Sequence, residues 1–147
     1  MNPRGFHCMQ ALHHGSCLCG AIRYQLFNEP KALSHCHCTQ CQKAHGAAFA
    51  SYASVPRTAL SIVSGLEALK GYQSSPGVTR QFCAHCGSSL FWHDTSGQFA
   101  DWISLAVATL DTPWVPGKSR HVWLDSRLSW SDTAMVQLLE AISHEPQ

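Results

Sequence analysis

Seven of the eight cysteines in this 147-residue sequence fall into three tight clusters, and no other feature restricts the fold as strongly. The clusters are Cys17 and Cys19, then Cys36, Cys38 and Cys41, then Cys83 and Cys86. Cysteines two or three positions apart are poorly placed to bridge each other but well placed to share one metal ion. We therefore expect metal ions to join segments of the chain that lie far apart in the sequence. Cys8 stands alone and is interpreted as a free thiol.

The rest of the composition favours metal over disulfides. The first 15 residues contain no apolar stretch like that of a signal peptide, and no apolar run approaches the ~20 residues that cross a bilayer. We therefore expect a cytoplasmic protein with no membrane partner, and in a reducing compartment clustered cysteines indicate metal binding or catalysis. The formal net charge is +1 and the ten Lys and Arg residues form no basic stripe, which argues against a nucleic-acid partner.

The hydrophobic pattern predicts one mainly β domain at residues 15–147, preceded by an N-terminal tail at residues 1–14. Within residues 19–26, Ile22, Tyr24 and Leu26 alternate with polar or small residues, as in a half-buried strand. Further short antiparallel strands are expected at residues 47–55, 60–65, 88–93, 102–110 and 120–124. A C-terminal helix is expected after Asp132, because Ala134, Met135, Leu138, Leu139 and Ile142 recur at helical spacing.

The outer cysteine pairs together form a complete ligand set. Cys17 and Cys19 share one face of an extended strand, and Cys83 and Cys86 have the spacing of a zinc knuckle followed by Gly87, which permits the positive φ of such turns. Two plus two gives four thiolates, the closed tetrahedral set of structural zinc. Such an ion would join residues 17–19 to residues 83–86 across most of the domain.

The middle cluster has three thiols, and its fourth ligand is open to three interpretations. His45 can close a Cys₃His structural site. His35 or His37 can do so instead, although adjacent residues of a strand point to opposite faces. Alternatively, the fourth position stays open to water or to a substrate thiol, as in a catalytic zinc site. Spacing alone does not separate the first interpretation from the third.

The order of these motifs resembles that of the glutathione-dependent formaldehyde-activating enzyme family, whose domain is shared with centromere protein V. The matching residues run from Gly15-Ser-Cys17-x-Cys19-Gly, through Cys36-His-Cys38-x-x-Cys41-x-Lys43, to Phe82-Cys83-x-x-Cys86-Gly-Ser, and the segment "RHVWLDSRLSW" resembles the family's closing segment. The resemblance covers residues 15 to about 130. It implies a β-tent fold with two zinc ions, the outer four cysteines holding a structural ion and the middle three a catalytic one. It also implies a carbon–sulfur lyase activity, the reversible joining of formaldehyde and glutathione.

Residue chemistry is compatible with that activity. A zinc ion with an open position would favour the thiolate form of a bound substrate thiol, which could then attack an aldehyde. His45 or His37 is the candidate for moving the proton, and Arg80 and Arg120 are candidates for holding the carboxylates of a glutathione-like partner. The alternative function is a non-catalytic, zinc-stabilised binding module with a closed Cys₃His second site. The sequence leaves the oligomeric state open, and a homo-oligomer is compatible with it.

Overall fold

Ten short strands and one short α-helix make up residues 9–131, the part of the chain that this computed structural model describes. They are β1 (His13–Ser16), β2 (Arg23–Leu26), β3 (Leu33–Cys36), α1 (Thr39–His45), β4 (Ala50–Pro56), β5 (Leu60–Ser64), β6 (Leu69–Ser75), β7 (Val78–Cys83), β8 (Ser89–Asp94), β9 (Trp102–Ala106) and β10 (Ser119–Val122). The mainly β prediction is confirmed. The expected C-terminal helix lies outside the described residues.

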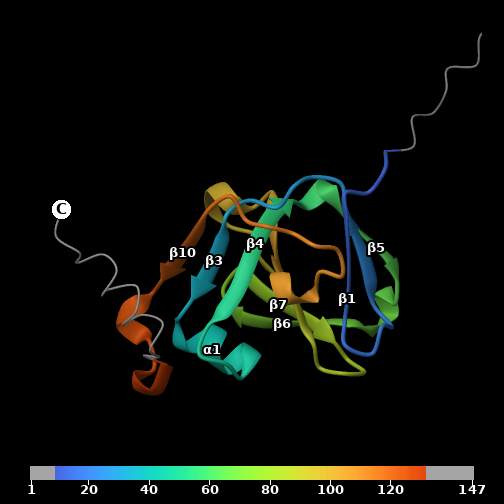
Figure 1. The fold of residues 1–147 in the computed structure, drawn as a ribbon. Helices are drawn as coiled ribbons and strands as arrows, with labels where there is room; N and C mark the ends of the chain where they lie inside the picture. The colour runs from blue at the N-terminus through green and yellow to red at the C-terminus, as the bar shows by residue number, and fades with distance from the viewer. Residues whose placement is uncertain (1–8, 132–147) are drawn as a thin grey trace, which may run out of the picture.

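The strands form two sheets (Figure 1). A three-stranded sheet has the order β1-β2-β5, and a seven-stranded sheet has the order β10-β3-β4-β9-β8-β7-β6. All pairings are antiparallel except that of β10 with β3, which is parallel. The six strands expected from the sequence are present within two to four residues of their expected ends. The pattern did not predict β1, β3, β6 or β7, and β1 begins two residues inside the expected tail.

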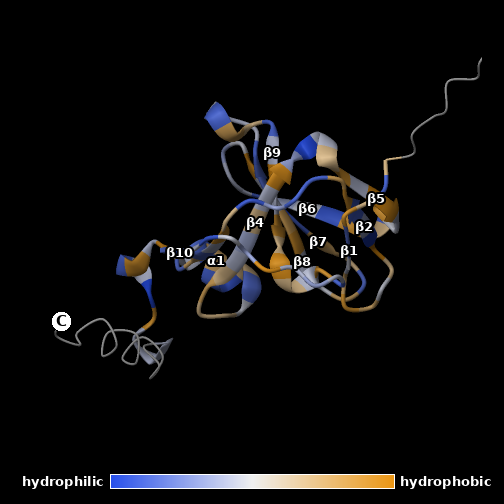
Figure 2. Cartoon of the chain, turned by 45° about the horizontal axis from the view of Figure 1, so that its top comes forward, coloured by the Kyte–Doolittle hydropathy of each residue, from blue (hydrophilic) through white to orange (hydrophobic). Residues whose placement is uncertain are grey.

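The core lies where the small sheet packs on one face of the large sheet. Alternation along β2 and the residue before it buries Ile22, Tyr24 and Leu26 almost completely, as predicted. The ring of Tyr24 meets that of Phe91 from β8 edge to face, with centroids 5.1 Å apart. Hydrophobic residues lie along β8 in Figure 2, where Leu90 is also fully buried.

The opposite face of the large sheet carries a different set of residues. In β9, Ile103 and Leu105 point into the core, so Trp102 and Ser104 point to the other side. In β4, Val55 belongs to the core, so Tyr52 and Ser54 share the opposite face with the β9 pair. This second face is where the candidate site lies.

Helix α1 has little apolar surface and is drawn largely in hydrophilic colours in Figure 2. Seven residues are too few for a helix to be stable alone in water. The Cys38 thiol caps its first turn by accepting from the Cys41 N–H, and Gly46 ends it in the left-handed conformation. The buried amide of Gln42 donates to the carbonyls of His37 and Ser126 at 2.7 and 2.9 Å. Capping and polar contacts, with the three-cysteine cluster, therefore hold α1 in place.

None of the helices within residues 9–131 has the length and apolar character needed to cross a bilayer.

Candidate metal and substrate site

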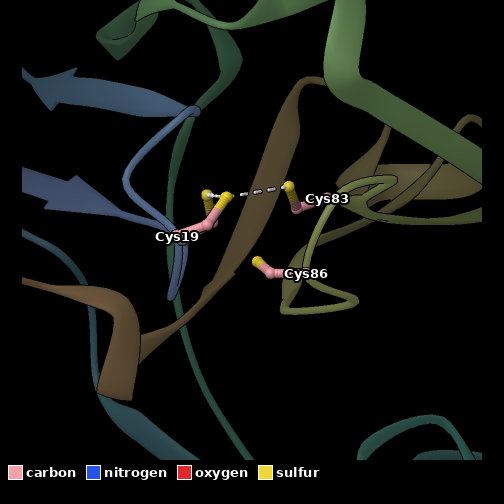
Figure 3. A group of neighbouring side chains, drawn as sticks. Cys19, Cys83 and Cys86 are labelled. Carbon is pink, nitrogen blue, oxygen red and sulfur yellow. Dashed lines mark hydrogen bonds between the residues drawn. The ribbon is translucent and has the colours of Figure 1, made fainter.

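Four cysteines converge between the two sheets, as the sequence predicted. Figure 3 shows three of these sulfurs pointing toward one another. Cys19 lies in the turn between β1 and β2, Cys83 is the last residue of β7, and Cys86 lies in the turn after it. The sulfur of Cys17 is the fourth of the group, and all four sulfurs lie within 4.8 Å of one another. The sulfur of Cys19 is 3.5 Å from that of Cys17 and 3.9 Å from that of Cys83. Thiolates bound to one zinc at ~2.3 Å in a tetrahedron lie about 3.8 Å apart, so this cluster fits the ion.

The turn after β7 has the expected geometry, but Cys17 and Cys19 lie in the turn between β1 and β2 and not on the extended strand that the sequence predicted. Gly87 has a φ of 75°, and its N–H donates to the Cys83 carbonyl at 2.8 Å. The N–H of Ile22 donates to the Cys17 sulfur at 3.3 Å, as expected for a sulfur that carries negative charge.

The pKa values of Cys86 and Cys19 are shifted in opposite directions. Hydrogen bonds from the Ser88 hydroxyl and N–H lower the pKa of Cys86 to about 5. The N–H of Ala21 acts to lower the pKa of Cys19, but Cys17 and the other thiols outweigh it and raise that pKa to about 11. Four adjacent thiols cannot all ionise without a positive charge between them, and a divalent cation would supply that charge.

The second cluster joins the end of β3 to the start of α1. Cys36 is the last residue of β3, Cys38 caps α1 and Cys41 lies in its first turn, and the three sulfurs lie within 4.8 Å of one another. Burial and the neighbouring thiols raise the pKa of Cys41 to about 12. Among residues 9–131, no histidine nitrogen belongs to this group. The cluster can therefore hold a metal ion with three thiolates.

Arg80 and Tyr52 lie beside this cluster. The Arg80 guanidinium donates to the Cys41 sulfur at 3.7 Å, to the Ser74 hydroxyl at 3.0 Å and to the Gln40 side chain at 3.4 Å. Burial, followed by the nearby Cys41 thiol, raises the pKa of Tyr52, which therefore keeps its proton at neutral pH.

His45 forms a hydrogen bond between its Nε2 and the Tyr52 hydroxyl at 2.7 Å. Burial and the charge of Arg80 lower the pKa of His45, so its neutral form prevails at pH 7. Tyr52 was not singled out from the sequence. Its alternation with Ala53 and Val55 in β4 was the only available signal, and that pattern places it on a face without saying what the face does.

His37 lies on the other side of β3. Its Nε2 is 2.8 Å from Nδ1 of His121, and its ring packs near Phe49, with centroids 4.9 Å apart. His35 forms a hydrogen bond with Ser51 at 2.8 Å and stacks at 4.7 Å on His121. This arrangement follows from strand alternation, since His35 and His37 point away from the side of Cys36 and Cys38.

The three-cysteine cluster opens into a cavity of about 1010 Å³ on the second face of the large sheet. Arg80 and Arg120, the two predicted carboxylate-binding residues, both line it, as does Lys31. Arg120 donates to the Ser34 hydroxyl at 2.9 Å. A smaller cavity of about 230 Å³, which includes His45, meets the large one at Tyr52 and Arg80.

These features define a class of protein: a mainly β domain with two cysteine clusters, one of four and one of three residues, each able to bind a metal ion. The chain belongs to the glutathione-dependent formaldehyde-activating enzyme family, whose model matches residues 12–126.

One curated protein is similar to this chain in sequence, and one solved structure is similar to it in fold. An uncharacterized lyase of Schizosaccharomyces pombe is 33% identical over 86 residues, which are 58% of this chain and 61% of that protein. The crystal structure of a Rhodobacter sphaeroides protein has the same fold, with a TM-score of 0.54 and 24% identity over 69% of this chain and 90% of that one.

Proposed function

We propose that this protein is a zinc-dependent carbon–sulfur lyase that joins a small thiol and a small aldehyde reversibly, with S-hydroxymethylglutathione as the reference substrate. Membership in the family and the lyase name of the fission yeast relative support this class of reaction. The observation that carries the proposal is the three-cysteine cluster, which faces a large cavity and includes no histidine among the described residues. A closed Cys₃His module would need a histidine nitrogen there, and His45 is bonded to Tyr52 instead.

The two clusters divide the metal chemistry between them in this proposal. Cys17, Cys19, Cys83 and Cys86 would hold a structural zinc within a β-tent domain, and Cys36, Cys38 and Cys41 would hold the second ion. When bound by three thiolates, zinc offers a fourth position where a substrate thiol loses its proton more readily.

The chain's own residues would orient the substrate and move the proton. In the forward direction the thiol sulfur bonds to the carbonyl carbon, and the carbonyl oxygen gains a proton. Tyr52 keeps its proton at neutral pH and lines the cavity, so it can donate to that oxygen. His45, hydrogen-bonded to Tyr52, can take up the proton that the thiol releases and return a proton to the Tyr52 hydroxyl, so that the thiol proton is balanced by the proton on the new hydroxyl. Arg80 and Arg120 would hold carboxylates of the thiol. We assign the proton transfer to His45 rather than His37, which is bonded to His121 outside the cavity.

The test combines spectroscopy with turnover. With cobalt in place of zinc, millimolar glutathione should change the visible spectrum of the wild type and of Cys8→Ser, but not that of Cys41→Ser. NMR exchange between formaldehyde and S-hydroxymethylglutathione should be faster with wild-type protein than without it. An unchanged cobalt spectrum would show that the second site is closed and would favour a binding module.

A further inference from the structure

The cavity beside the three-cysteine cluster is larger than its reference substrate requires. Its volume of about 1010 Å³ lies at the upper end of the range of about 300–1,000 Å³ for small-molecule sites. All seven strands of the large sheet contribute residues to it, from Arg120 on β10 to Ser75 on β6. Formaldehyde adds only one carbon and one hydroxyl to glutathione, so that adduct gives no reason for so much extra space.

Small hydroxyl side chains on the floor create this space. Ser34, Ser54 and Ser104 project from the three adjacent strands β3, β4 and β9, where large aliphatic residues usually lie. The hydroxyls of Ser54 and Ser104 are hydrogen-bonded to each other at 2.9 Å. Their polar groups are therefore satisfied without a ligand, and the volume above them stays open.

The walls around this floor are aromatic. Trp92 and Trp102 line the cavity from β8 and β9, and Phe99 and Trp123 line it from connecting segments. Phe99 is 60% exposed and Trp123 is 68% exposed, so both rings are accessible to a ligand. Large exposed aromatic rings around a concave site are typical of the binding of an apolar group.

The backbone of Trp123 adopts a conformation that is unfavourable for a residue with a large side chain. Its φ of 60° is the only positive value at a non-glycine residue within residues 9–131. Bulky residues adopt this conformation rarely, and when they do so it is often at functional sites. The conformation turns the chain after β10 while keeping an indole at the cavity, which a glycine would not provide.

The cavity is also positively charged. Lys31, Arg80 and Arg120 line it, and no aspartate or glutamate is among the described lining residues. The Lys31 ammonium lies 5.8 Å from the centroid of the Trp102 ring, so positive charge and aromatic surface adjoin. A ligand that matches this lining carries both carboxylates and an apolar group.

We infer that this cavity takes thiol adducts in which the aldehyde-derived part is a large apolar group, such as an aromatic ring, on an anionic thiol. The inference rests on the proposed function for the position of the sulfur. The corresponding reaction is R–CH(OH)–S–R′ giving R–CHO and HS–R′. The carbon–sulfur bond breaks, the hydroxyl proton moves to sulfur, and nothing is oxidised or reduced.

Binding of two stable thioethers tests the inference without turnover. S-benzylglutathione and S-methylglutathione have the same charges and differ in the apolar group on sulfur. Isothermal titration of the zinc-loaded wild type should give about tenfold tighter binding of the benzyl compound, equal to about 1.4 kcal/mol. Equal affinities would overturn the inference, even if S-hydroxymethylglutathione is turned over, and a benzyl preference supports it whatever the turnover.

Three variants locate the preference. Trp123→Gly removes the indole and leaves a residue suited to positive φ, so the fold should survive. Ser104→Leu fills the floor. Both should reduce the benzyl preference about fivefold or more, while the affinity for S-methylglutathione stays within twofold. Trp130→Ala is the matched control, since Trp130 is equally exposed at 68% but does not line the cavity, and it should keep the preference. An equal loss in Trp130→Ala, or none in the other two, would overturn the inference.

Discussion

At the scale of single residues, Tyr52 lies where the small cavity beside His45 meets the large cavity beside the three-cysteine cluster. Its hydroxyl is bonded to His45 at 2.7 Å, and the residue lines both the small cavity and the large one. Because burial and Cys41 raise its pKa, Tyr52 keeps its proton at neutral pH, as its proposed role of proton donor requires. Removal of this hydroxyl therefore tests the proposed proton transfer directly.

Tyr52→Phe should lower the rate of thiol–aldehyde exchange by about 10²-fold or more, the usual contribution of a general acid. The ring remains but the hydrogen bond to His45 is lost, so the variant should stay folded and lose about 0.5–1.5 kcal/mol of stability. Tyr24→Phe is the control, because Tyr24 is buried and its hydroxyl is bonded to Thr109 at 2.8 Å in the core. That variant should lose about 0.5–1.5 kcal/mol of stability and no activity. Full activity in Tyr52→Phe would remove the tyrosine from the proposed mechanism.

Arg80 and Arg120 offer a second comparison at this scale, since both cations line the cavity but only Arg80 touches a cysteine. Arg80→Met should weaken metal binding by the three-cysteine cluster about tenfold, because a charged hydrogen bond to sulfur contributes about 1.5–3 kcal/mol. Arg120→Met should leave metal affinity unchanged and weaken binding of anionic thioethers. Chelator competition and titration calorimetry measure the two effects, and identical behaviour of the variants would contradict the assignment.

At the scale of secondary structure, two glycines that end or begin elements differ in their surroundings. Gly46 ends α1 with a φ of 57° and open space around it, whereas a Cβ on Gly65 would lie 2.2 Å from the Ala21 carbonyl oxygen. Both glycines have positive φ, so an alanine at either position would have the same kind of backbone strain. Only the steric clash differs between the two positions.

Gly46→Ala should therefore cost about 1 kcal/mol of stability, from the left-handed conformation alone. Gly65→Ala should cost more, because the backbone at Ala21 and Ile22, just before β2, must move away from residue 65. Urea denaturation of both variants gives the comparison. Equal losses would show that the contact with Ala21 relaxes freely.

At the scale of the whole molecule, the two cysteine clusters connect very different lengths of chain. The four-cysteine cluster joins segments 64 residues apart, from Cys19 to Cys83, while the three-cysteine cluster lies within residues 36–41. An ion in the first cluster closes a long loop, which the unfolded chain closes only at an entropic cost.

Cys86→Ser should therefore leave the protein largely unfolded, since structural zinc contributes ~10–16 kcal/mol of binding energy against ~5–15 kcal/mol of total stability. Cys41→Ser should remain folded, bind one zinc instead of two and lose the cobalt response to thiol. Circular dichroism, melting temperature and zinc content distinguish the two. Collapse of Cys41→Ser would make the middle ion structural as well.

The sequence by itself determined the two cysteine clusters and the mainly β class, because cysteine spacing and period-two alternation are local patterns. Cys17 with Cys19, Cys83 with Cys86, and the buried series Ile22, Tyr24 and Leu26 all follow from residues within a few positions of one another. Helix α1 was missed because a capping thiol and the buried Gln42 stabilise it, and neither produces a hydrophobic period.

Only the tertiary structure decided which residues face the cavity. Ser54 and Ser104 meet because β4 pairs with β9, and Arg80 lies opposite Trp92 because β7 pairs with β8. The side chain of His37 points to the opposite side of the chain from the cysteines, where it is hydrogen-bonded to His121. Strand order and register depend on packing between residues far apart in the sequence, so alternation can place a side chain on one of two faces but cannot say what that face encloses.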